Sequence, residues 1–146
     1  MKRLLPLLLL FALLLTSLTG CVSGDPAVSA KRLTKAGYDV KTYETEASVG
    51  DALFFFGIDG AGTDTVVAAF DRDSACPLAF VYVVYCENNE AASYVLADSQ
   101  AFIKNNLDRY LTYGEEDGGF TKADFTAVQK GKIVLFGLKS MIKVAS

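Results

Sequence analysis

The run of residues 78–85 contains only apolar and aromatic side chains, in the order Leu-Ala-Phe-Val-Tyr-Val-Val-Tyr. β-branched and aromatic residues dominate this run, which favours a strand over a helix. A strand without polar residues on either side has to be covered on both faces or lie in the centre of a sheet. We therefore expect residues 78–85 to form the strand around which the rest of the chain packs.

Helix signals occur in four other segments. In the first, Asp25 is a good N-cap, Pro26 is a good first helical residue, and Gly37 can end the helix. The second is a short apolar run before Gly57, which a strand would also fit. The third has apolar residues at helical spacing after a polar cap. We expect helices over residues 26–36, 52–56 and 89–111, and a short helix after residue 137.

Strand signals occur before and after the central run. Tyr38, Val40 and Thr42 alternate with polar or partly polar residues, which is typical of a strand with one covered face. Two further segments are rich in valine and end at turn residues. We expect strands over residues 38–44, 65–70 and 132–136, and either a short strand or an irregular approach over residues 120–128.

After the first helix, the expected order is strand, helix, strand, strand, helix, strand. This βαββαβ order predicts an α+β fold of the ferredoxin-like type, a two-layer sandwich in which two helices cover one face of an antiparallel sheet. It would have an extra N-terminal helix and a short C-terminal helix. A related α+β sandwich would give the same order. Residues 26–146 are enough for one domain with its own core.

The beginning of the chain has the layout of an export signal. Lys2 and Arg3 precede an apolar run over residues 4–15, and small or polar residues follow it. The run is shorter than the roughly 20 residues that a membrane-spanning helix requires, and it contains Pro6. We therefore expect residues 1–20 to be a cleaved signal peptide.

The signal ends in Leu18-Thr19-Gly20-Cys21, which resembles the lipobox of bacterial lipoproteins. The resemblance implies that the Cys21 thiol receives a diacylglycerol, and that this palmitate-type anchor holds the domain on the extracytoplasmic face of a cell membrane. Residues 21–25 would then be a short tether. The alternative is an ordinary secretory signal that leaves Cys21 unmodified. The type of bacterial envelope stays open.

The mature part is similar, in composition and in the strand-to-helix ending at residues 131–143, to small lipoproteins of Gram-positive anaerobes. This similarity implies no particular activity, because it includes no motif that carries chemistry.

The helix expected after the tether carries Lys31, Arg32 and Lys35. Held so close to a bilayer, these three side chains could contact anionic headgroups, each contributing about 1 kcal/mol. The alternative is an ordinary solvated helix face.

Charge and composition exclude several functions. Without Lys2 and Arg3 the 14 basic residues fall to 12 against 17 acidic ones, so the mature chain has a formal charge of −5. This charge disfavours nucleic-acid binding. The chain has no histidine, which removes the commonest general base and the usual zinc ligand. We predict no cofactor, no metal site and no catalytic residue.

Several acidic segments indicate alternative functions. Asp71 and Asp73 could act as a carboxylate pair, although a solvated turn explains them better. Residues 59–64 look like one unit of a glycine and aspartate calcium repeat, which lacks a neighbouring unit. Residues 113–124 partly resemble an EF-hand loop, but Tyr113 occupies the position of its first carboxylate.

Two cysteines remain in the mature domain besides Cys21. Cys76 and Cys86 would lie roughly 33 Å apart if they belong to one strand, too far for a disulfide. We expect both to be free thiols. Three tyrosines, Tyr43, Tyr110 and Tyr113, could form a recognition surface or simply belong to the core.

These observations favour a membrane-anchored interaction or ligand-sensing module that is not an enzyme and meets another envelope protein or a small ligand. The alternative is an acidic-site enzyme or calcium-dependent domain that uses Asp71, Asp73 or residues 115–117. A structural subunit of a membrane complex is a third hypothesis. A pocket with converging carboxylates would favour the enzyme, and an exposed apolar patch would favour the binding module.

Overall fold

The computed structural model describes residues 21–74, 78–111 and 119–146. The expected signal peptide, Cys76, Tyr113 and the acidic residues 115–117 lie outside these ranges. In the part of the chain that is described, no helix has the length and apolar character needed to cross a membrane.

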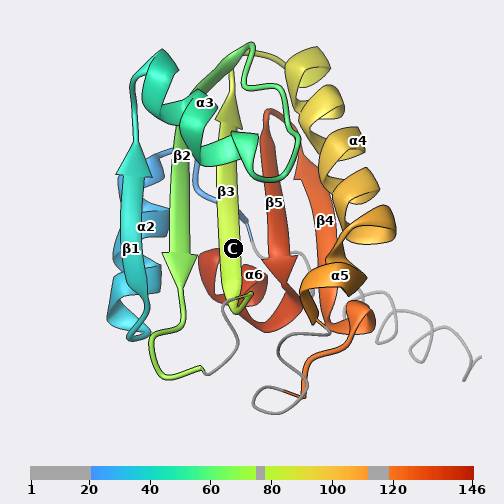
Figure 1. Ribbon diagram of the computed structural model, residues 1–146. Coiled ribbons are helices and arrows are strands. Elements are labelled where there is room, and N and C mark those ends of the chain that lie inside the picture. The colour runs from blue at the N-terminus through green and yellow to red at the C-terminus, as the bar shows by residue number, and fades with distance from the viewer. Residues whose placement is uncertain (1–20, 75–77, 112–118) are drawn as a thin grey trace, which may run out of the picture.

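A five-stranded antiparallel sheet forms the middle of the molecule (Figure 1). The order of its strands is β1-β2-β3-β5-β4, so β3 is central and β5 lies between β3 and β4. The strands are β1 (Asp39–Tyr43), β2 (Thr63–Phe70), β3 (Phe80–Cys86), β4 (Phe125–Lys130) and β5 (Ile133–Leu138).

Helices cover both faces of this sheet (Figure 1). On one face, α2 packs on β1 and β2 and α6 packs on β5 and β3; on the other, α3 packs on β2 and α4 packs on β4 and β5. The short α5 continues from α4 on that second face. The helices are α2 (Pro26–Lys35), α3 (Glu46–Phe54), α4 (Asn89–Asn105), α5 (Leu107–Leu111) and α6 (Lys139–Ala145), and a 3₁₀ turn, η1, spans Lys122–Asp124.

The α+β class and the central position of β3 are confirmed. Every residue of β3 is buried, as its sequence of apolar and aromatic residues predicts. Successive side chains of β3 point to opposite faces. Tyr85 therefore reaches Ser29 of α2 on one face, while Tyr82 contacts Phe56 after α3 on the other.

The ferredoxin-like order is not confirmed. In a split βαβ unit the two strands joined by a helix are parallel and another strand lies between them. Here β1 and β2, which α3 connects, are direct antiparallel neighbours. Residues 125–130, for which the sequence left open a strand or an irregular segment, form β4 and pair with β5. The expected sandwich has two layers, with helices on one face of the sheet. Here helices cover both faces, so the domain has three layers.

Caps explain where the helices begin. The Asp25 carboxylate accepts a hydrogen bond from the Ala27 N–H, as expected. The second helix is confirmed as a helix, but it begins earlier than predicted because Thr45 and Ser48 form a capping box. The long helix starts after Asn88, as expected, and ends at Asn105, where α5 follows as a separate turn.

The β4–β5 connection and the β3–β5 pairing each depend on a glycine. Gly131 has a φ of +61° and is the first residue of the two-residue turn between Lys130 and Ile133, a position that favours glycine. Gly137 has a φ of +133° and pairs with Val81 of β3. A Cβ at position 137 would collide with the carbonyl oxygen of Phe80 and lie 2.9 Å from Cα of Val81. The glycine therefore permits β5 to lie close to the start of β3.

Candidate functional site

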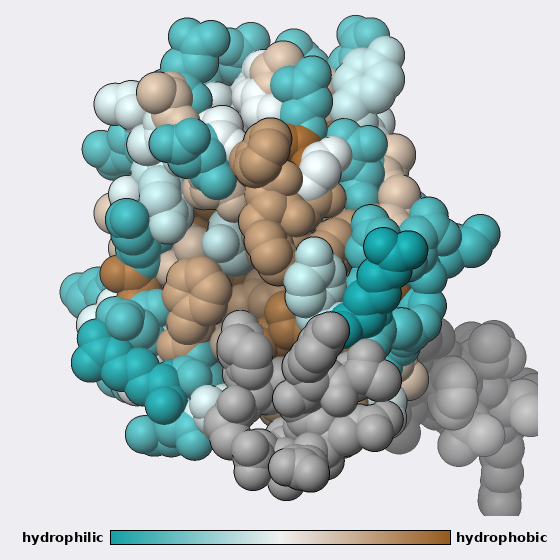
Figure 2. All heavy atoms as spheres, viewed as in Figure 1, coloured by the Kyte–Doolittle hydropathy of each residue, from teal (hydrophilic) through white to brown (hydrophobic). Residues whose placement is uncertain are grey.

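An aromatic groove opens on the face of the sheet that carries α3 and α5. Its volume is about 380 Å³. Figure 2 shows hydrophobic side chains gathered in the middle of this face, over the sheet and between the helices. We define the aromatic groove by its lining residues, which come from the end of α3, from β2, from β3 and the residue Leu78 before it, and from α5: Phe55, Phe56, Phe70, Leu78, Phe80, Tyr82 and Tyr110.

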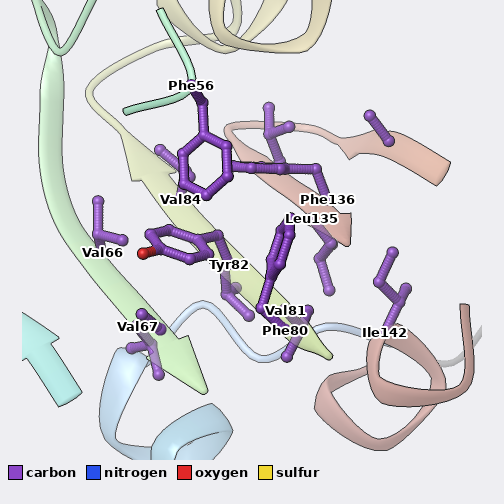
Figure 3. Close-up of a cluster of buried hydrophobic side chains, with 14 of the residues drawn as sticks. Phe56, Val66, Val67, Phe80, Val81, Tyr82, Val84, Leu135, Phe136 and Ile142 are labelled. Carbon is purple, nitrogen blue, oxygen red and sulfur yellow. The ribbon is translucent and has the colours of Figure 1, made fainter. Parts of the chain in front are cut away.

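The floor of the aromatic groove is rigid because its rings pack against one another. Phe56 is its centre, with ring centroids 4.9 Å from Tyr82, 5.1 Å from Phe80 and 5.0 Å from Phe136. Most of these contacts are edge-to-face or tilted, the arrangements that aromatic quadrupoles favour. Figure 3 shows the Phe56 ring lying against Tyr82 and Phe136. These rings are almost completely buried.

The rim of the groove, in contrast, is accessible. Phe55 is 52% exposed, and Phe70 and Tyr110 are each 36% exposed. The ring centroids of Phe55 and Tyr110 are 5.1 Å apart, so the rings at the end of α3 and in α5 meet across the groove. Phe70 lies on the β2 side, 6.0 Å from the Tyr82 ring. An incoming apolar group would therefore find aromatic surface on three sides.

The end of α3 explains why these rings are exposed. Phe54 is the last residue of α3, and Phe55 and Phe56 follow it in the turn before Gly57, so the three side chains point in different directions. Phe56 enters the core, Phe55 forms the rim, and Phe54, which is not among the lining residues, is 83% exposed. Gly57, with a φ of +67°, then ends this segment.

Among the described residues, the lining carries no charged side chain, and its side-chain polar groups are the hydroxyls of Tyr82 and Tyr110. Burial raises the pKa of the Tyr82 hydroxyl well above its usual range, and the nearby Tyr43 adds a smaller increase. The Tyr82 hydroxyl therefore stays neutral at physiological pH. The site is suited to an uncharged apolar group, and it contains no pair of groups for acid–base chemistry.

Tyr110, one of the three tyrosines predicted for a recognition surface, lines the groove, and Tyr43 does not. Tyr43 is half-buried on β1, with the Lys41 ammonium 4.8 Å from the centre of its ring. Tyr113 lies outside the described residues. Sequence reasoning missed Phe55, Phe56 and Phe70, although a run of three phenylalanines before a glycine is a usable signal, because three adjacent side chains at the end of a helix cannot all enter one core.

The predicted lipid site and basic residues lie at the start of the described chain. Cys21 is exposed. Val22 packs against the core, and the Asp25 N–H donates to Ser23 Oγ at 3.1 Å within the segment before α2. Lys31, Arg32 and Lys35 are all exposed on α2. On the inner side of α2, Ser29 is buried and accepts a hydrogen bond from the Tyr85 hydroxyl, whereas Ala27 is exposed.

The acidic segments have local structural roles where they are described. The Asp71 carboxylate accepts from the Asp73 N–H at 3.0 Å, a turn hydrogen bond. Arg72 between them forms an ion pair with Asp39 at 2.6 Å, and the hydrogen bond from its guanidinium lowers the pKa of the Asp39 carboxyl. Asp124 caps η1 by accepting from the Thr121 N–H at 2.7 Å.

A second hollow, of about 610 Å³, lies beside the turn at residues 59–62 and is lined partly by acidic side chains. In this turn the Asp59 carboxylate accepts from the Ala61 N–H, and Gly62 has a φ of +73°. Within the described ranges, no three histidine, cysteine, aspartate or glutamate residues are arranged to hold a metal ion. The carboxylates of this hollow are Glu44, Glu46, Asp59, Asp64 and Glu87.

Cys86 is buried at the end of β3. Burial raises the pKa of its thiol, and the hydroxyl of Thr63 opposes this to a smaller extent. The buried, protonated thiol lacks the low pKa of a reactive cysteine. The predicted distance between Cys76 and Cys86 involves Cys76, which lies outside the described residues.

Comparisons of this chain with protein-family models, with curated proteins and with solved structures give no match in any of the three. The functional conclusion therefore depends on the residues of the site itself.

Proposed function

We propose that this chain is a bacterial lipoprotein, anchored through Cys21 on the extracytoplasmic face of the cell membrane, whose aromatic groove binds a small, uncharged apolar ligand. It acts as a sensing or binding module and not as an enzyme. The observation that carries the proposal is the groove itself, with a packed aromatic floor, an accessible rim and no charged side chain among the lining residues that the structure describes.

Size and chemistry both support a ligand of this class. Sites for small molecules usually have volumes of about 300–1,000 Å³ and are mainly apolar with a few polar groups that orient the ligand. The aromatic groove, at about 380 Å³, is within this range, and two hydroxyls supply its polar contacts. A charged ligand would lose its hydration in the groove without gaining an ionic partner.

Binding is tested on the lipidated protein in detergent, with the neutral aromatic probes indole and p-cresol and the charged probes benzoate and benzylamine, by chemical-shift titration. We expect the neutral probes to bind and the charged ones to bind more weakly. Phe55→Ala should weaken indole binding roughly three- to tenfold, because one aromatic contact contributes about 0.5–1.5 kcal/mol.

Phe54→Ala is the matched control. It removes the same side chain from the adjacent position of the same helix, but Phe54 does not line the groove. Equal effects of the two substitutions, or equal binding of neutral and charged probes, would refute the proposed site.

Anchoring is tested separately by the intact mass of protein extracted from membranes. We expect a mass increase that corresponds to a diacylglycerol, which Cys21→Ala abolishes. A freely secreted product of unmodified mass would contradict the anchor, and the alternative of an acidic-site enzyme or calcium-dependent domain would then be examined next.

A further inference from the structure

We propose that the outer surface of α2 and α6 is a docking face for anionic lipid headgroups, and that it orients the domain with the aromatic groove directed away from the membrane. We call this surface the basic face. The inference extends the proposed anchoring at Cys21 from a point of attachment to a fixed orientation.

The two helices of this face are the only ones among the described residues that carry basic side chains and no acidic ones. Helix α2 contains Lys31, Arg32 and Lys35, and α6 contains Lys139 and Lys143. On the opposite face of the sheet, α3 contains two acidic residues and no basic one. In a mature chain with a charge of −5, this segregation produces a positive surface on one side of a negative domain.

Helical geometry directs most of these cations away from the sheet. Lys31 and Lys35 are each two positions from the fully buried Leu33, about 200° around the helix, so they project from the side opposite the core. Lys143 has the same relation to the buried Met141 and Ala145 of α6. Arg32 projects sideways and is also exposed.

Contacts between α2 and α6 make the basic face continuous. The Ser29 hydroxyl of α2 donates to the Ala145 carbonyl of α6 at 3.4 Å, and it accepts a hydrogen bond from Tyr85 at 2.8 Å. Lys139 donates to the Ala123 carbonyl at 2.5 Å, which directs it toward η1. Four cations therefore remain for headgroups: Lys31, Arg32, Lys35 and Lys143.

The tether brings this face to the bilayer. Only four residues separate Cys21 from α2, and their full extension is about 14 Å. Because Val22 packs against the core, the lipid-bearing residue is held closer to the domain than that length. Along α2, Lys31 and Lys35 lie about 8 and 14 Å from Pro26, so both are within roughly 28 Å of the attachment point even if the tether is fully extended.

The orientation has a direct consequence for the groove. Tyr85 of β3 points to α2 and Tyr82 of the same strand points into the aromatic groove, so the basic face and the groove are on opposite sides of the sheet (Figure 1). When α2 and α6 contact headgroups, the groove faces outward.

Because the chain has no tryptophan, a single introduced tryptophan is a unique reporter. The lipidated protein carrying Thr34→Trp on α2 is reconstituted in vesicles of brominated phosphatidylcholine, with and without phosphatidylglycerol. We expect quenching of this tryptophan in the anionic vesicles and little in the neutral ones. Phe54→Trp, on the other face, should be quenched in neither.

Lys31→Gln with Lys35→Gln should reduce the ratio of docked to undocked protein roughly 30-fold, because each lysine contributes about fivefold near an anionic surface. Lys41→Gln with Lys104→Gln changes the net charge equally on other parts of the domain and should leave quenching unchanged. Equal quenching in both kinds of vesicle, or equal effects of the two pairs, would overturn the basic face.

Failure of the anchor is distinguished by mass. If the purified protein lacks the lipid, the anchor is refuted, and the same two pairs of variants are compared by co-sedimentation with the same vesicles. If the lipid is present but quenching ignores phosphatidylglycerol, the anchor stands and the basic face is wrong.

Discussion

Gly137→Ala tests the close approach of β5 to β3 that supports the floor of the aromatic groove. The new Cβ would meet the carbonyl of Phe80 and the Cα of Val81, both backbone atoms that cannot move without displacing β3. The positive φ of 133° adds conformational strain. Strain of this kind costs about 1–3 kcal/mol, and overpacking costs about 1–3 kcal/mol more. We therefore expect the free energy of unfolding to fall by roughly 2–6 kcal/mol.

Gly131→Ala is the control, because Gly131 also has a positive φ but has nothing within 4 Å of the position of an added Cβ. This control should cost only about 1–2 kcal/mol, the conformational contribution alone. Urea unfolding followed by circular dichroism measures both variants. If Gly137→Ala destabilises no more than Gly131→Ala, then β5 does not approach β3 as closely as described.

Three further perturbations have defined outcomes. Burial raises the pKa of Tyr82, so its contribution to the free energy of unfolding is complete below about pH 10 and is lost above it by about 1.4 kcal/mol per pH unit. Tyr82→Phe should therefore flatten the decline of stability between pH 10 and 11, and an unchanged slope would contradict this. Ser29→Ala removes the acceptor of the Tyr85 hydroxyl and should cost about 1–3 kcal/mol in urea unfolding, part of which the double variant Ser29→Ala with Tyr85→Phe should recover. Asn88→Ala removes the side-chain oxygen that accepts from the Ala91 N–H and should lower the melting temperature through a loss of about 1 kcal/mol, whereas a neutral result would mean that α4 does not need this cap.

Local structure was predictable where one residue type determines it. Asp25 with Pro26 fixed the start of α2, and the uninterrupted apolar run identified β3 as central. The order of the strands was not predictable in the same way. It depends on β4, whose residues alternate in burial but include Thr126 and Gln129, so its sequence has no clear apolar face. Pairing with β5 decides that this segment is a strand.

The candidate site was less predictable, because a groove is made by residues that are distant in the chain. Phe55, Phe70 and Tyr110 come from three elements, and only the packing of α3 and α5 on one face brings them together. The run of three phenylalanines before Gly57 indicates that at least one ring is exposed, but it does not show which one, and no local pattern marks Phe70 or Tyr110 as exposed. The basic residues of α2 were visible in the sequence, but the contribution of Lys143 became apparent only when α6 was found beside α2.

The insertion of β5 between β3 and β4 also bears on the order in which the protein folds. The turns that join β2 to β3 and β4 to β5 are local, whereas the pairing of Val81 with Gly137 closes a long loop and bears its entropy cost. Strand β4 follows β3 in the chain, yet it pairs with β5 and not with β3, so it can join the sheet only together with β5 or after it. We therefore expect a meander of β1, β2 and β3 and a separate hairpin of β4 and β5 to form first, and their association along β3 and β5 to limit the folding rate.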